Sequence, residues 1–184
     1  MNPEDLLAKY FPAEALPLFL THSRLVARKA VLTAGKHPAA PELDIGFIEE
    51  AAMLHDIGVA LTSAPGLGCH GMAPYILHGI IGREVLEREG LPHHGLVCER
   101  HIGVGLTVAD IKGQGLPLPL RDMVPVTNEE KIVAFADLFF SKKPDILTVE
   151  KPLEQVRREL ARFGPGKVEI LEGWLAEFSY AEQV

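Results

Sequence analysis

The sequence predicts an all-α fold, and two observations on its apolar residues support this. Hydrophobic residues make up 47% of the chain but aromatic residues only 7%, so Ala, Leu, Val and Ile supply most of the apolar side chains. This composition favours interlocking helices over a β-sandwich. The apolar residues also recur at helical spacing. A length of 184 residues suits one domain with a substantial core, so we expect a single domain over residues 1–184 with about seven to nine helices.

The stretches with helical spacing follow one another along the whole chain. In order, they cover about 3–10, 17–34, 44–57, 74–89, 93–102, a brief helix from 107, 127–140, 151–163 and 165–180. Their starts carry residues that cap or open helices, namely Asn2, Asp44, Pro74, Thr107 and Thr127.

Glycines are expected to end four of these helices, at Gly35, Gly58, Gly90 and Gly164. Three segments read as connections: a proline-containing loop at 36–43, a loop of small residues and turn formers at 62–71, and an extended connector at 113–120. Because a loop as long as the second commonly has a function, we expect it to line a pocket.

The net charge of −7 argues against binding to long nucleic acids, which require a basic face. A small anionic substrate stays compatible with it, because bound metal can reverse the sign of a pocket. Cys69 and Cys98 are too few for a disulfide framework, which favours a reducing compartment. The acidic start does not resemble a signal peptide, and no uncharged apolar run approaches membrane-spanning length. We expect a cytoplasmic protein without a membrane partner, and the sequence is compatible with a homodimer.

The stretch from Ala51 to Gly58 carries an adjacent His55–Asp56 pair at the end of an apolar helical run. An imidazole nitrogen and a carboxylate oxygen are both ligands for a divalent transition metal. Because helical neighbours point about 100° apart, the two can share an ion only at the edge of the helix, where Asp56 could also bridge two ions. Alone, such a pair more commonly forms a buried salt bridge.

Four further potential ligands stand among apolar residues on other predicted helices, namely His22, His78, His101 and Asp137. Each histidine alone would be interpreted as a hydrogen-bonded core residue. Asp137 lies within Ala-Phe-Ala-Asp-Leu-Phe-Phe, where burial without a partner would cost several kcal/mol. The joint occurrence of these residues on five helices favours a shared metal site.

The other histidines and one cysteine are weaker candidates. His37, His93 and His94 lie in or near predicted loops, and we expect them at the surface. His70 lies in a glycine-rich loop that could fold over the pocket, so its place stays open. Cys98 is one helical turn from a candidate ligand, but a small buried thiol is the better interpretation.

The order His, His-Asp, His, His, Asp, with the literal sequence His-Asp-Ile-Gly at 55–58, resembles the HD-domain superfamily of metal-dependent phosphohydrolases. The likeness covers about residues 17–141, and the additional histidines resemble its two-metal branch. The resemblance implies an all-α helical bundle of the HD-domain type, followed by a C-terminal helical extension over about 148–182. Members cleave phosphate mono- and diesters of nucleotides, which implies a small anionic, phosphate-containing substrate.

Carried over by position, the resemblance implies two metal sites. The ligands of the first would be His22, His55, Asp56 and Asp137, and those of the second would be Asp56 as a bridge with His78 and His101. Asp56, His78 and His101 are also the expected catalytic residues, because a water bridging the metals would attack phosphorus. The mixed nitrogen and oxygen ligands suit two ions of Fe, Mn, Co, Ni or Zn and disfavour Ca.

Three departures leave the substrate unassigned. The chain lacks the Gly-Tyr-Pro signature of the cyclic-di-GMP phosphodiesterases, and Val59 stands where many relatives have a basic residue. It reads His-Ile-Gly at 101–103, where the hydrolases that cleave diadenosine tetraphosphate symmetrically read His-Thr-Thr-Gly. The stretches 98–101 and 129–132 instead resemble an uncharacterised bacterial and archaeal subgroup of HDIG-domain proteins.

Arg100 is the first candidate for binding the substrate phosphate, because a guanidinium makes bidentate contacts with phosphate. A salt bridge with Glu99 or another acid is an equal alternative for it, and Arg83 and Lys131 are further candidates. Three other functions stay open beside the phosphohydrolase: a one-metal 5′-nucleotidase, a di-iron oxygenase on the same scaffold, and a non-catalytic nucleotide sensor.

Overall fold

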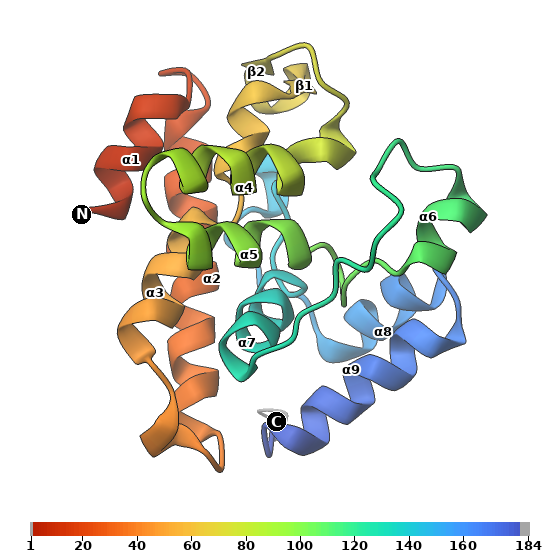
Figure 1. Ribbon diagram of the computed structural model, residues 1–184. Coiled ribbons are helices and arrows are strands. Elements are labelled where there is room, and N and C mark those ends of the chain that lie inside the picture. Colours follow the sequence, from red (N-terminus) through yellow and green to blue (C-terminus); the bar gives the residue numbers. More distant parts are fainter. Residues whose placement is uncertain (1, 181–184) are drawn as a thin grey trace.

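Within residues 2–180, which the computed structural model describes, the chain is built almost entirely from helices (Figure 1). The α-helices are α1 (Pro3–Tyr10), α2 (Leu16–Lys36), α3 (Ile45–Leu54), α4 (His78–Arg88), α5 (Pro92–Arg100), α6 (Val108–Gln114), α7 (Asn128–Asp137), α8 (Leu153–Ala161) and α9 (Pro165–Glu177). Short 3₁₀ helices are η1 (Ala40–Glu42), η2 (Ile57–Leu61), η3 (Pro65–Leu67), η4 (Tyr75–Leu77) and η5 (Pro144–Ile146). The all-α prediction is confirmed.

A small hairpin replaces part of one predicted loop. Strands β1 (Ser63–Ala64) and β2 (Cys69–His70) pair antiparallel, with Ser63 opposite His70. The loop predicted over 62–71 is therefore wrong in detail, because η3 between the strands turns the chain back on itself. The predicted extension over 148–182 contains α8 and α9, and its last two residues lie outside the described part of the chain.

Helix α2 contacts α3 along one side and α7 along another. In Figure 1, α4 and α5 lie one above the other across the front, and α7 lies below α5. Helix α4 also packs on η2, and α5 also contacts α3 and α7. Helices α8 and α9 pair with each other and join the rest through contacts between α9 and α7. This arrangement brings the ends of α3, α5 and α7 toward α2 and the start of α4.

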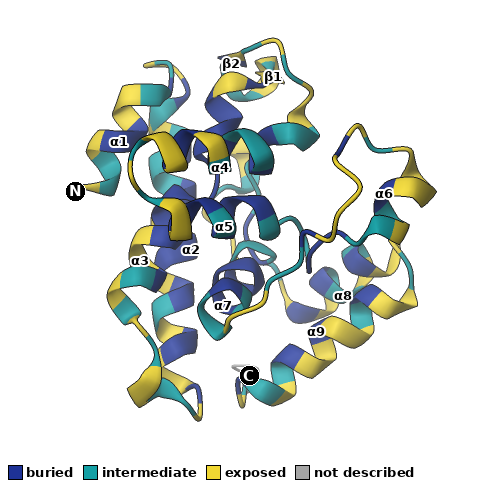
Figure 2. Ribbon diagram, viewed as in Figure 1, coloured by how far each residue is buried: buried dark blue, intermediate teal, exposed yellow. Residues whose placement is uncertain are grey.

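The core lies between α2 and the helices around it, whose inner faces are buried and whose outer faces are exposed (Figure 2). Its largest fully buried side chains include Phe19, Phe135 and Phe139. Burial of an apolar side chain of this size contributes about 1.5–3 kcal/mol. Trp174 and Phe178 at the C-terminal end belong to the same cluster.

The side chains predicted to begin helices do cap them. Oxygens of Asn2, Asp44, Thr107 and Thr127 accept hydrogen bonds from backbone N–H groups of the first turns of α1, α3, α6 and α7. Thr107 completes a reciprocal capping box with Asp110. At α7 the carboxylate of Glu130 instead accepts from Val126 N and pairs with Arg100, so only half of a reciprocal capping box forms.

The predicted end of α2 at Gly35 is wrong, since the helix continues to Lys36. A glycine inside a helix costs only about 1 kcal/mol relative to alanine, so it does not by itself stop one. The chain leaves the helix at His37, whose ψ is 139°. The next residue is Pro38, and a residue before proline avoids the helical conformation.

Two other predicted boundaries are also shifted. Helix α3 ends at Leu54, so His55 and Asp56 follow it instead of lying inside it, and Gly58 belongs to η2. Helix α4 begins at His78 after the short η4, and not directly at Pro74. Among the described residues, no helix is both long and apolar enough to cross a lipid bilayer.

Candidate metal centre

The six ligands predicted from the sequence converge on one buried place, although they come from five separate elements. They form two groups whose potential ligand atoms lie within 4.8 Å of one another: His22, His55, Asp56 and Asp137 in the first, and Asp56, His78 and His101 in the second. Asp56 belongs to both groups, so its carboxylate lies between them.

In the first group, both histidines point Nε2 at both carboxylates. His22 Nε2 lies 3.0 Å from Asp137 Oδ1 and 3.4 Å from Asp56 Oδ2. His55 Nε2 lies 3.2 Å from Asp56 Oδ2 and 3.4 Å from Asp137 Oδ1. These four side chains therefore present two nitrogens and two oxygens toward a common point.

The second group faces the other oxygen of the shared carboxylate. Asp56 Oδ1 lies 3.7 Å from His78 Nε2 and 3.6 Å from His101 Nε2. The two imidazole nitrogens are themselves 3.3 Å apart. Each oxygen of Asp56 thus serves one group.

The end of α3 explains how adjacent residues reach one place. His55 keeps helical dihedral angles, whereas Asp56 moves to φ −105° and ψ 7° as the chain enters η2. The change at Asp56 redirects its side chain from the helical direction. The pair therefore lies directly after the end of α3, where both side chains can face one point.

Glycine at position 58 allows η2 to lie directly on α4. A Cβ atom there would stand 2.0 Å from the carbonyl oxygen of His78 and 2.4 Å from the backbone nitrogen of Gly82. No side chain fits in that space. This close approach brings His78 to Asp56.

Glycine at position 79 allows α4 and α5 to approach closely, because a Cβ atom there would lie 2.7 Å from the carbonyl oxygen of Cys98. Gly82 also faces the side chain of Cys98. The Cys98 thiol is fully buried and donates to Leu54 O at 3.3 Å. The interpretation of Cys98 as a packed thiol is confirmed, and the tight helix pair places His101 opposite His78.

Three of the four histidines are oriented by the same backbone contact. Nδ1 of His55, His78 and His101 lies 2.7–2.8 Å from the carbonyl oxygen three residues earlier. A carbonyl can only accept, so Nδ1 carries a proton in all three rings and Nε2 is the nitrogen that faces the centre. A histidine that ligates a metal is commonly held in this way through its other nitrogen.

This geometry fits a divalent metal. With Nδ1 protonated on both rings, the facing Nε2 atoms of His78 and His101 are both acceptors, and neither can donate to the other. Asp56 Oδ1, which faces both of these nitrogens, is buried without a hydrogen-bond donor. Unsatisfied buried acceptors that converge on one point are stabilised by a shared cation.

The structure also brings a residue to the centre that the sequence analysis missed. Lys142 Nζ lies 2.8 Å from Asp56 Oδ2 and 3.7 Å from Asp137 Oδ1, and its side chain is only 16% exposed. Because α7 ends at Asp137, the chain folds back over the next five residues and carries the ammonium to the centre. On a continued helix these residues would have lain on different faces.

The charged groups of the centre shift one another's pKa values. Burial works against the ionised carboxylates, but the Lys142 ammonium and the histidines together outweigh it and keep the pKa of Asp56 and of Asp137 well below the usual range. Burial, together with His101, lowers the pKa of His78 to about 4, so this ring is neutral. Burial also opposes charge on His55, but the two carboxylates raise its pKa to about 10.

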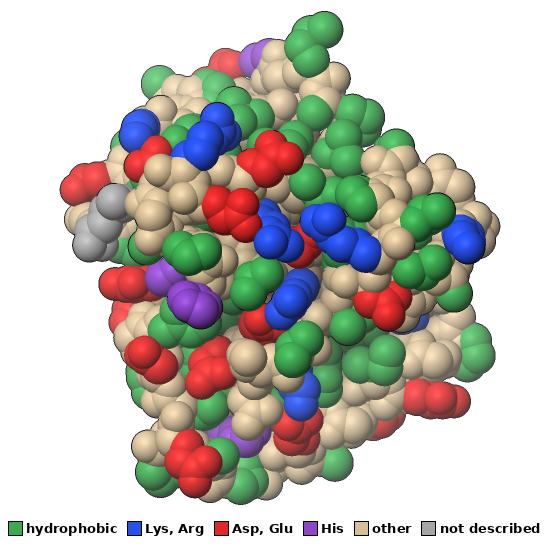
Figure 3. All heavy atoms as spheres, in the orientation of Figure 1, with side chains coloured by type: hydrophobic (Ala, Val, Ile, Leu, Met, Phe, Trp, Pro, Cys, Tyr) green, Lys and Arg blue, Asp and Glu red, His purple; other side chains and the backbone are tan. Residues whose placement is uncertain are grey.

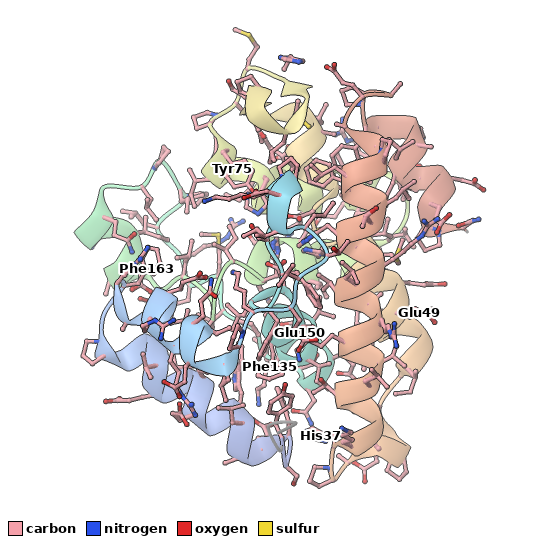
Figure 4. The ribbon with its side chains drawn as sticks, turned by 180° about the vertical axis from the view of Figure 1, so that it is seen from behind. His37, Glu49, Tyr75, Phe135, Glu150 and Phe163 are labelled. Carbon is pink, nitrogen blue, oxygen red and sulfur yellow. The ribbon has the colours of Figure 1, made fainter. Side chains whose placement is uncertain are left out.

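Tyr75 borders the centre on its more exposed side. Its ring packs on that of His78 at 4.8 Å between centroids, and its carbonyl oxygen orients the same histidine. Figure 4 shows Tyr75 beside η5, the turn that follows Lys142. Burial raises the pKa of Tyr75 to about 12, an effect that Lys142 opposes and Asp56 reinforces.

Comparison with known proteins agrees with this arrangement. The family model described as HD domain matches residues 19–140. The chain belongs to the HD-domain family. The matched segment contains all six candidate ligands and ends two residues before Lys142.

Two solved structures of the HD domain of the L. monocytogenes phosphodiesterase PgpH show the same fold. One has a TM-score of 0.56 at 16% identity and covers 95% of this chain and 87% of the other. The second, in complex with cyclic-di-AMP, has a TM-score of 0.54 at 15% identity and covers 99% and 98%.

Relatives in sequence come from archaea. An uncharacterised protein of Methanocaldococcus jannaschii is 38% identical over 117 residues, which are 62% of each chain. A tRNA (cytidine(56)-2′-O)-methyltransferase of Thermoplasma volcanium is 36% identical over 138 residues, which are 74% of this chain but 35% of that protein. The HD-domain chain thus spans less than two thirds of the length of both relatives.

The cations predicted to bind the substrate phosphate are engaged elsewhere in this HD domain. Basic side chains lie across the middle of the face in Figure 3, with acidic side chains between them. Arg100 pairs with Glu130 at 2.7 Å, which is the alternative that the sequence left open. Arg83 pairs with Glu99 and Glu87, and Lys131 with Glu177.

The remaining histidines divide differently than expected. His93 is exposed, as predicted, whereas the predictions for His37 and His94 are wrong because both are buried. His37 packs on Phe178, and His94 is the third residue of α5 and packs on Phe47. The exposed His70 pairs with Glu14 at 3.0 Å and stands outside both ligand groups.

Proposed function

We propose that this HD domain is a metal-dependent phosphohydrolase that cleaves a phosphate ester or anhydride in a nucleotide or nucleotide-like small molecule. The observation that carries the proposal is the Asp56 carboxylate, which faces one group of candidate ligands with each oxygen. An aspartate placed in this way suits a two-metal site.

His22, His55, Asp56 and Asp137 would hold the first ion, and Asp56, His78 and His101 the second. The mixed nitrogen and oxygen ligands suit Fe, Mn, Co, Ni or Zn. When bound, two such ions supply an activated water as nucleophile and neutralise charge on the phosphate oxygens. Asp56, His78 and His101 are therefore the proposed catalytic residues.

Lys142 is our proposed phosphate-binding residue. Its ammonium is already at the centre, and the pKa of the group is raised by Asp137 and Asp56 despite burial, so it stays charged. The candidates Arg100, Arg83 and Lys131 stay predictions, but their acidic partners Glu130, Glu99 and Glu177 lie outside the two ligand groups. The acidic partners of Lys142 are themselves candidate metal ligands. A single ammonium donates up to three hydrogen bonds to phosphate oxygens.

The nucleotide part of the proposal has narrower support. The related fold in PgpH was crystallised with cyclic-di-AMP, which shows that such a fold accommodates a nucleotide. The net charge of −7 continues to argue against long nucleic acids as substrates. We do not propose methyl transfer, because the relatives with that name are proteins of which this chain matches about a third.

Two experiments test the function. Elemental analysis of the purified protein identifies the bound metals. A panel of nucleotides is then assayed for phosphate release in the presence of those metals. We expect about two transition-metal ions per chain and release of phosphate from, or cleavage of, at least one nucleotide. Asp56→Ala should abolish both metal loading and turnover, because it removes a ligand from both groups. Asp5→Asn, on the exposed face of α1, should change neither. Turnover retained by Asp56→Ala would refute the proposal.

A further inference from the structure

A cavity of about 810 Å³ lies away from the candidate metal centre, between the C-terminal half of α2 and the segments around 139–153 and 178–180. None of the six candidate metal ligands lines it, and neither does Lys142. Much of its wall comes from residues beyond 140, outside the matched family segment. Its volume lies within the range of small-molecule sites, about 300–1,000 Å³.

The charge of this cavity is opposite to that of the chain. Its lining contains the four cations Arg28, Lys29, Lys36 and Lys151 but only one acid, Glu150, in a protein whose net charge is −7. Lys29 pairs with Glu150, and Lys151 pairs with Glu159. A positive cavity on an acidic protein selects anions.

Arg28 and Lys36 are the cations that stay available. Both are exposed, and among residues 2–180 neither has an acidic side chain within salt-bridge distance. Lys36 in the last turn of α2 also interacts favourably with the helix dipole. Arg28 lies two turns earlier, beyond the reach of that effect.

Lys29 gives the cavity a fixed and buried charge. Its Nζ lies 2.6 Å from Glu150 Oε1, 3.0 Å from the Tyr180 hydroxyl and 3.8 Å from the centre of the Phe139 ring. The residue is only 8% exposed, so its ammonium is held in place by these contacts. Figure 4 shows Glu150 on the connecting segment beside α2.

An exposed apolar residue lies between the two available cations. Arg28, Leu32 and Lys36 stand four residues apart on α2 and therefore share one face, with about 12 Å of helix between the outer two. Leu32 is 57% exposed between them, and Pro152, which also lines the cavity, is exposed as well. A ligand that satisfies this surface needs anionic groups and an apolar part.

We propose that this cavity is a second ligand site, for a nucleoside polyphosphate. Arg28 and Lys36 bind its phosphates, and Leu32 and Pro152 contact its base. The site is separate from the metal centre, although Phe139 and Phe140 in its wall belong to the segment between Asp137 and Lys142. The inference does not depend on the proposed hydrolysis.

Isothermal titration of the full chain with ATP, GTP, CTP and UTP tests this site. The titrations use the Asp56→Asn variant with EDTA, so that no metal centre contributes. We expect at least one nucleotide to bind once per chain with Kd below about 1 mM. The added substitutions Arg28→Glu and Lys36→Glu should weaken that binding by at least about tenfold, because two contacts with phosphate become repulsive.

Two control variants distinguish binding in this cavity from a general effect of net charge and from binding at the metal centre. Arg88→Glu with Lys112→Glu makes the same change in net charge at exposed positions outside the cavity, and should leave the Kd within about twofold. Lys142→Ala should also leave it within about twofold. Absence of binding, binding that survives the reversal at Arg28 and Lys36, an equal loss in the charge-matched control, or a loss in Lys142→Ala would each overturn the proposal. Melting temperatures establish that every variant is folded.

Discussion

Lys142 brings a positive charge to within 2.8 Å of Asp56 Oδ2, beside candidate ligands that are all histidine or aspartate. His and Asp among apolar neighbours are chemically conspicuous, because burial of such groups requires a partner. Lys142 follows Phe139 and Phe140 in a short segment and has no periodic relation to Asp137 on a continued helix. Its place depends on where α7 ends, which the apolar pattern does not specify.

The position of Lys142 leads to a prediction with two opposite readouts. Lys142→Ala should lower kcat/KM about 10- to 100-fold, because one charge-assisted contact with phosphate is lost. The same substitution should tighten metal binding, since it removes a positive charge 2.8 Å from Asp56 Oδ2. Kinetics and metal titration measure the two effects. Lys143→Ala, at the exposed neighbouring position, is the control. Weaker metal binding in Lys142→Ala would show that Lys142 only supports the structure.

Glu99 gives a prediction on pH dependence. Burial disfavours its charged form, but Arg121 and Arg83 outweigh this and lower its pKa. A carboxylate with a lowered pKa stabilises the fold above the pKa of the unfolded chain, about 4.3, and this contribution disappears as pH falls through the folded-state pKa. Glu99→Gln should therefore cost about 1–3 kcal/mol at pH 7 and progressively less below about pH 4.3.

Urea unfolding of the wild type and Glu99→Gln at pH 7 and near pH 4 measures this difference. Glu87→Gln removes the more exposed partner of Arg83 and should cost less than about 1 kcal/mol at both pH values. A cost for Glu99→Gln that does not change with pH would show that shape, and not charge, makes Glu99 important.

At the scale of elements, helix starts were predicted better than helix ends. A cap is a local event in which a side-chain oxygen binds a backbone N–H two or three residues later, so Asn2, Asp44 and Thr107 could be identified from their neighbours. The ends depend on what the chain meets next. Pro38 ended α2 where Gly35 did not. His37 and His94 became buried because other elements pack over them.

The contact between η2 and α4 supplies a prediction at this scale. Gly58→Ala should destabilise the protein by about 1–3 kcal/mol, because the new Cβ would overlap the His78 carbonyl and force the two elements apart. It should also weaken binding of the second metal ion more than the first, since His78 moves away from Asp56. Denaturant unfolding and metal titration measure the two effects.

Gly173→Ala is the matched control for this substitution. It lies in α9 with no atom within 4 Å of the added Cβ, so the same change should stabilise the helix by up to about 1 kcal/mol. Equal stability of Gly58→Ala and the wild type would mean that the elements separate without cost, and that Gly58 does not position His78.

At the scale of the whole molecule, composition and periodicity were sufficient for the all-α fold, because both are properties of local sequence. The cavity beside α2 could not be predicted in this way. Its wall combines Arg28 and Lys36 with residues more than a hundred positions later, and their meeting depends on how the C-terminal segments pack. The same holds for the convergence of five elements at Asp56, which the resemblance implied and periodicity alone did not.

The convergence of five elements also means that bound metal should stabilise the entire fold. The candidate ligands lie on α2, after α3, on α4, after α5 and at the end of α7, so the unfolded chain cannot offer them together. A ligand present at 100 times its Kd adds about 2.7 kcal/mol, which for a domain of this size corresponds to about 5–10 °C in Tm. Removing metal from the purified protein with excess EDTA should lower its Tm by about that amount. Asp56→Asn should show no EDTA effect, because both ligand groups lose a member, whereas Asp5→Asn should respond as the wild type does. A Tm that is insensitive to EDTA in a metal-loaded wild type would place the metal somewhere other than this centre.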